Sequence, residues 1–75
     1  MDEVRRRTDA ALALLRHTVA ATEQARDAAL REGQERVARE EEATIAGLEG
    51  RIAWLERQAA EFEERQARRV QEEGW

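Results

Sequence analysis

The sequence predicts an all-α protein built from two long helices. Ala, Glu, Arg, Leu and Gln supply 53 of the 75 residues, and these residue types favour helices. Pro, Ser and Asn, which interrupt helices and build turns, are absent. We expect a helix over about residues 2–32, a hinge at about Gly33 and a second helix over about residues 34–73, all within one helical unit spanning 1–75.

The expected first helix carries an apolar pattern along one face. Leu12, Leu15, Val19 and Thr22 follow one another at spacings of three or four residues. Such a spacing places them on one side of a helix, since a turn takes about 3.6 residues. We therefore expect Leu12, Leu15 and Val19 to pack against another helix.

The expected second helix carries a sharper pattern, with apolar residues at the a and d positions of a heptad repeat. The pattern is clearest between residues 45 and 62 and weakens on both sides of this range. A heptad seam of this kind packs against a second helical seam. Taking the two helices together, we assign eight residues to the helix–helix interface: Leu12, Leu15, Val19, Ile45, Leu48, Ile52, Leu55 and Phe62.

Gly33 allows the chain to fold back, because glycine accepts the positive φ that commonly follows the end of a helix. In an antiparallel hairpin centred there, residues whose numbers sum to about 67 face each other. Leu12 then meets Leu55, and Leu30 meets Val37. Among the flanking charges, we expect Arg16 to face Glu49.

The alternative fold is one long continuous helix that dimerises as a parallel coiled coil, roughly 105 Å long. The absence of a capping Ser, Thr, Asp or Asn near Gln34 favours this alternative. Only the hairpin, however, buries both apolar segments within one chain. We therefore favour the hairpin.

A second apolar surface lies on the second helix, around Gly47, Gly50 and Trp54. Two glycines within four residues destabilise a helix unless a close approach requires them, and aromatic residues anchor many interfaces. We interpret the three residues as a partner-docking site. A tolerated half-exposed Trp, or a local break in the helix near the glycines, would also fit. With two apolar faces, the hairpin is expected to assemble into a four-helix or larger bundle.

The sequence offers no recognisable catalytic or metal-binding motif. It has no cysteine and a single histidine, so we expect no zinc site and no cofactor. His17 has only Ala and Leu as helical neighbours, and we expect it to be a partly buried or interfacial structural residue rather than a catalytic one. Because catalysis needs a nucleophile, a base or a metal held in a cleft, we predict that the protein is not an enzyme.

Charge and hydropathy limit the expected partners. The net charge is −4 with interleaved signs, and the one basic cluster, Arg5–Arg7, is diluted by nearby acids. Nucleic acid is therefore not the expected partner. No apolar run approaches the ~20 residues of a membrane helix, and the start of the chain lacks the order of a secretory signal. We expect a protein without a membrane segment, intracellular (cytoplasmic) or part of a particle.

These features predict a non-enzymatic coiled-coil interaction protein. It would act as a structural, assembly or accessory subunit of a larger complex, such as a phage or other particle, or as a helical chaperone. Its partners would be further copies of itself or helices of a larger assembly. The alternative is a small regulatory binder or inhibitor, or a nucleic-acid-associated regulator that uses Arg5–Arg7.

Overall fold

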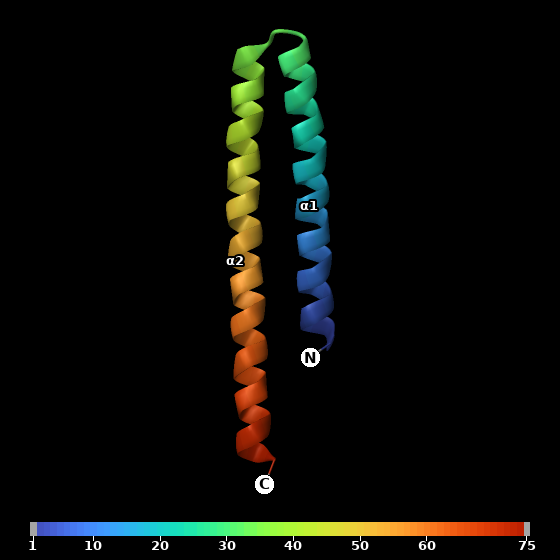
Figure 1. Cartoon of the computed structure of the whole chain (residues 1–75). Coiled ribbons are helices and arrows are strands. Elements are labelled where there is room, and N and C mark those ends of the chain that lie inside the picture. Colours follow the sequence, from blue (N-terminus) through green and yellow to red (C-terminus); the bar gives the residue numbers. More distant parts are fainter. Residues whose placement is uncertain (1, 75) are drawn as a thin grey trace.

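The computed structural model describes residues 2–74 and confirms an all-α antiparallel hairpin (Figure 1). Helix α1 spans Asp2–Arg31, and helix α2 spans Glu35–Glu73. The helices lie side by side along the whole length of α1, and α2 extends beyond the start of α1 (Figure 1). The continuous-helix alternative is therefore wrong for this chain.

The turn between the helices depends on Gly33, whose φ is +74°. Its backbone N–H donates to the carbonyl oxygen of Leu30 at 3.1 Å, and the N–H of Gln34 donates to the carbonyl oxygen of Ala29 at 2.8 Å. This pair of hydrogen bonds is a Schellman motif, which satisfies carbonyl groups at the end of a helix. Gln34 precedes α2 without a capping side-chain hydrogen bond. The turn is thus stabilised by backbone hydrogen bonds at the end of α1 rather than by a capping side chain at the start of α2.

The two helices pack along one seam that has heptad spacing on both sides. On α2 the buried and half-buried residues recur every three or four positions: Ala38, Glu41, Ile45, Leu48, Ile52, Leu55, Ala59, Phe62 and Gln66. On α1 the main seam positions are Thr8, Leu12, Leu15, Val19, Thr22, Arg26 and Ala29. All eight residues that the sequence assigned to the interface belong to this seam, which extends beyond the purely apolar part of the pattern.

The layer nearest the turn differs from the sequence-based expectation. Ala29 and Ala38 are buried there, whereas Leu30 and Val37 are 51% and 40% exposed. Each of these larger residues lies one position from a seam residue, which rotates it by about 100° away from the contact. The prediction that Leu30 meets Val37 in the core was therefore wrong, and two alanines bring the helices together close to Gly33.

The hairpin is slender and buries little of its own surface. Its Cα atoms extend over 65 × 16 × 11 Å, with a radius of gyration of 18.0 Å, against about 11 Å for a globular domain of this length. The accessible surface is 6186 Å², whereas about 4,700 Å² is typical of a compact monomer of this mass. Among the side chains of residues 3–74 none is fully buried. One layer of two helices therefore leaves large apolar areas in contact with solvent.

We expect Gly33→Ala to destabilise the hairpin by about 1 kcal/mol, because an L-residue with a side chain is strained at positive φ. Gly50→Ala is the matched control, since Gly50 is helical and a Cβ there meets no atom within 4 Å. It should stabilise the hairpin by about 0.5–1 kcal/mol. Urea unfolding followed by far-UV circular dichroism at one protein concentration measures both changes. Equal effects of the two substitutions would contradict the role assigned to Gly33.

Candidate interaction surfaces

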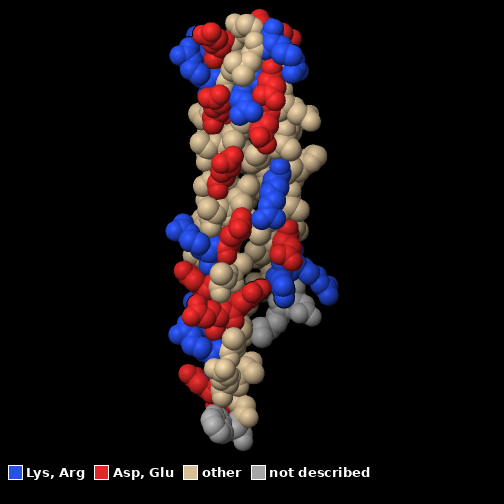
Figure 2. All heavy atoms as spheres, viewed as in Figure 1, with Lys and Arg blue, Asp and Glu red and all other residues tan. Residues whose placement is uncertain are grey.

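One side of the hairpin is acidic. A row on α2 at seven-residue spacing consists of Glu42, Glu49, Glu56 and Glu63, all exposed. The matching row on α1 contains Asp9, Arg16 and Glu23. Arg16 Nη2 lies 3.2 Å from Glu56 Oε1, so the two rows share one side of the molecule. We call this side the acidic face, and Figure 2 shows acidic side chains along it.

Inter-helix ion pairs on this face correct one expectation from the sequence. Arg16 pairs with Glu56 and not with Glu49. Side chains tilt toward the N-terminus of their own helix, so in an antiparallel pair Arg16 and Glu56 lean toward each other, whereas Glu49 leans away. The pair is more than half exposed on both sides, and exposed pairs of this kind contribute little to stability.

The opposite side of the hairpin is apolar. Leu14 on α1 is 66% exposed and Trp54 on α2 is 52% exposed, and both line one shallow hollow between the helices. The hollow is completed by Ala11, Leu15, Arg51 and Leu55. Large exposed apolar side chains that converge from two helices mark an interaction surface more strongly than isolated ones do. We call this side the apolar face.

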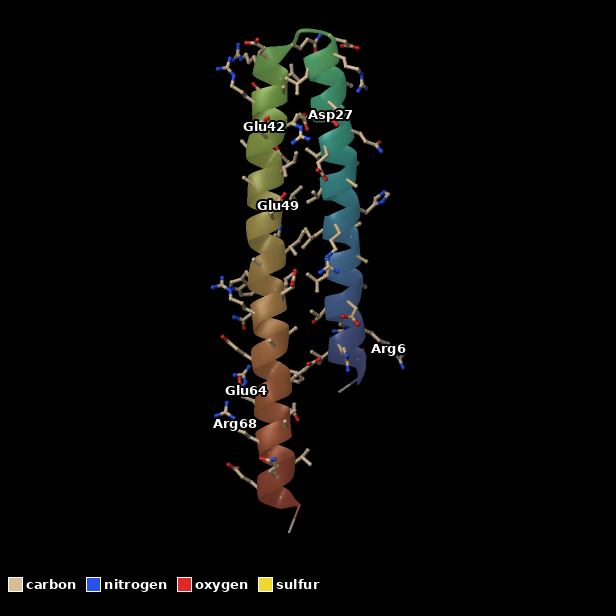
Figure 3. The ribbon with its side chains drawn as sticks, viewed as in Figure 1. Arg6, Asp27, Glu42, Glu49, Glu64 and Arg68 are labelled. Atoms are coloured by element: carbon tan, nitrogen blue, oxygen red, sulfur yellow. The ribbon has the colours of Figure 1, made fainter. Side chains whose placement is uncertain are left out.

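The three residues that the sequence grouped as a docking site lie on two adjoining rows of α2. Gly47 stands seven residues before Trp54 and therefore lies in the same row, on the apolar face. Gly50 stands 14 residues before Glu64 and so shares its row, which points away from α1 at the outer edge of α2 (Figure 3). Because Gly50 is also four residues before Trp54, the two rows adjoin each other. Helix α2 is continuous through both glycines, so a local break near them is excluded.

Sequence reasoning missed the contribution of α1 to this surface. Leu14 was visible as a large apolar residue beside the seam formed by Leu12 and Leu15, but no pattern within α1 pairs it with Trp54. That pairing follows only from the register of the two helices. Ala11 and Arg51 join the surface for the same reason.

A further hollow lies at the open end of the hairpin. It is lined by residues of both helices, including Val4, Thr8, Leu55, Ala59 and Phe62. Thr8 and Ala59 are small and stand at matching levels of the seam, so they leave this layer incompletely filled. Phe62, which the sequence assigned to the interface, therefore packs less completely than Ile45, which is buried.

The basic cluster at the start of α1 does not form one patch. Arg5 Nε lies 3.7 Å from Glu63 Oε1, and Arg7 Nη2 lies 2.9 Å from Glu3 Oε1. Arg6 points away from α2 on the outer side of α1 (Figure 3). Consecutive helical residues are about 100° apart, so the three guanidinium groups point in different directions.

The remaining chemistry of the described residues is sparse. His17 is exposed on α1, so it is not partly buried within the hairpin, and the expectation of an interfacial histidine stays a prediction. Across residues 2–74 we find no group of three His, Asp or Glu side chains placed to hold a metal ion. Within the same residues, neither helix combines the length and the apolar character that crossing a membrane requires.

We compared the chain with known proteins. No protein-family model, no curated protein and no solved structure shows significant similarity to this chain.

We expect Ile45→Ala to destabilise the hairpin by about 2–3 kcal/mol, because it removes a buried side chain from the seam. Val70→Ala is the control, since Val70 is exposed on the part of α2 that extends beyond α1. Its effect should stay within about 0.5 kcal/mol. Thermal unfolding of both variants at equal concentration tests the difference, and a loss from Val70→Ala as large as that from Ile45→Ala would contradict the seam.

Proposed function

We propose that this chain is a non-enzymatic helical interaction protein that serves as a structural, assembly or accessory subunit of a larger complex. The observation that carries the proposal is the apolar face, where Leu14 and Trp54 remain exposed on both sides of one hollow. The hairpin seam is already occupied by α1 and α2. The exposed apolar face is therefore available to a partner.

The energetics of a small two-helix unit support the same proposal. Small domains bury too little apolar surface to be more than marginally stable, and many gain stability from an oligomer or a partner. Burial of a large apolar side chain contributes about 1.5–3 kcal/mol. Covering Leu14 and Trp54 would thus supply a contribution comparable to the total margin of a small core.

The shape of the molecule indicates how such a partner is bound. A slender hairpin presents long helical surfaces, and helices pack on such surfaces through rows of side chains at i, i+3, i+4 and i+7. The hollow beside Leu14 and Trp54 is open and, apart from Arg51, lined by apolar side chains. We therefore propose that the partner presents helices, either from further copies of this chain or from a larger assembly.

No observation favours the alternative of a nucleic-acid-associated regulator. Arg5 and Arg7 each lie against a carboxylate, and the face beside Glu63 is acidic. Phosphate contacts dominate nucleic-acid affinity, and they require basic side chains gathered on one surface.

The proposal is tested by affinity capture from the native source with three tagged forms of the chain. Wild type and Ala53→Glu should retain the same identified protein, or further copies of the chain itself. Trp54→Glu should retain about tenfold less, because a charge replaces an aromatic anchor. Ala53 is the matched control, since it is exposed and adjacent to Trp54 but outside the apolar face.

Two outcomes would contradict the proposal. The first is a hairpin that melts cooperatively as a monomer at micromolar concentration and captures no protein. The second is capture of duplex DNA at low salt that is lost when Arg5, Arg6 and Arg7 are changed to Ala, which would support the regulator instead.

A further inference from the structure

We propose that a second copy of this chain docks on the apolar face, antiparallel to the first, and forms a four-helix dimer. A two-fold axis perpendicular to the helices would relate the copies. This inference rests on the proposed function and names the partner. It predicts which side chains of the two copies meet.

The pattern of large and small residues on the apolar face supports a two-fold axis. On α1 the row contains the large Leu14 and the small Ala21, and on α2 it contains the small Gly47 and the large Trp54. Each pair is seven residues apart. Their midpoints fall at about 17.5 and 50.5, which sum to 68 and so lie within one residue of the register in which facing residues sum to about 67. Both pairs are therefore centred at nearly the same level of the hairpin.

A two-fold axis at that level places the large residues of one copy opposite the small residues of the second copy. Leu14 of one copy would pack on Ala21 of the second copy, and Trp54 would pack on Gly47 of the second copy. A Cβ placed at Gly47 meets no atom of its own chain within 4 Å, so the space above it is open. Large side chains opposite small ones keep the spacing between helices even. The arrangement also explains a glycine that otherwise only weakens α2.

The apolar face is large enough for a stable dimer. Helix α1 has 30 residues, which corresponds to about 45 Å at about 1.5 Å per residue. Two helices side by side are roughly 20 Å wide. The face therefore offers roughly 900 Å², and a stable interface buries about 800 Å² on each partner.

The distribution of carboxylates favours docking of the second copy on the apolar face rather than on the acidic face. Two acidic faces brought together would oppose rows of carboxylates that include Glu42, Glu49 and Glu63. On the apolar face, the carboxylates of the rows, Glu40 and Glu61, lie toward the ends of the hairpin, as do Arg7 and Arg68. Arg51 is the charged residue that lines the central hollow, and an Arg side chain can cover apolar surface with its stem while its guanidinium reaches the solvated rim. The centre, around Leu14 and Trp54, can be buried without burying a carboxylate.

A parallel dimer is the competing arrangement on the same face. It would place Arg7 near Glu61 of the second copy, whereas the antiparallel dimer brings Glu40 toward Glu61. These charges lie at the exposed rim, where ion pairs contribute little. The parallel dimer would also place Leu14 opposite Trp54 and Ala21 opposite Gly47. The layer in which the two small residues, Ala21 and Gly47, face each other would then contain a gap. Interiors tolerate such gaps poorly, so packing favours the antiparallel dimer.

Sedimentation equilibrium over a range of concentrations tests the face. Wild type should dimerise reversibly, and Trp54→Glu or Gly47→Leu should weaken the dimer by about 100-fold. The matched controls are Ala53→Glu and Ala46→Leu, which introduce the same side chains at exposed positions of one row outside the face. They should shift the dissociation constant by less than about threefold. Circular dichroism of each variant checks that the hairpin remains helical.

Cross-linking tests the orientation, and the chain suits it because it contains no cysteine. An equal mixture of Leu14→Cys and Ala21→Cys chains should form a mixed disulfide under mild oxidation. A mixture of Ala21→Cys and Gly47→Cys should not. The reverse result would overturn the antiparallel arrangement in favour of the parallel one.

The failures of the two proposals can be distinguished. A chain that stays monomeric at high concentration but still captures another protein through Trp54 would overturn the dimer and leave the proposed function standing. A monomer that captures nothing would overturn both. A dimer that tolerates Trp54→Glu and Gly47→Leu would overturn the assignment of this face.

Discussion

The packing of α1 against α2 along one seam determines every other feature of the molecule. Once Leu12, Ile45 and their neighbours face each other, the two remaining sides of the pair are fixed by the heptad repeat. One side receives the glutamate row that includes Glu56, and the other receives Leu14 and Trp54. The acidic and apolar faces are thus consequences of a single helix–helix register.

The sequence predicted the parts of the structure that depend on local chemistry. Heptad spacing is a property of one helix, and the positive φ of Gly33 is a property of one residue, so both could be read without coordinates. The predictions that were wrong concern how the two helices are placed relative to each other. The burial of Ala29 in place of Leu30 depends on the rotation of the last turn, and the partner of Arg16 depends on the tilt of side chains. The contribution of Leu14 depends on the register.

The helical and hinge glycines show how one residue type can have different roles. Gly33 is required by the backbone conformation of the turn. Gly47 and Gly50 are both helical, and neither is required by a contact within the chain. Only their position separates them, because Gly47 shares the heptad row of Trp54, whereas Gly50 lies in the neighbouring row on the outer side of α2. A glycine that destabilises its own helix is best explained by a neighbour outside the hairpin, and Gly47 is placed to have one.

The two faces differ in the strength with which they select a partner. Glutamates seven residues apart in one row are separated by about 10 Å, which is about one Debye length at physiological ionic strength. Their combined repulsion is therefore moderate, and it falls as salt rises. Burial of Leu14 and Trp54 does not depend on screening. The apolar face should thus set the affinity for a partner, while the acidic face mainly limits the orientations in which that partner can bind.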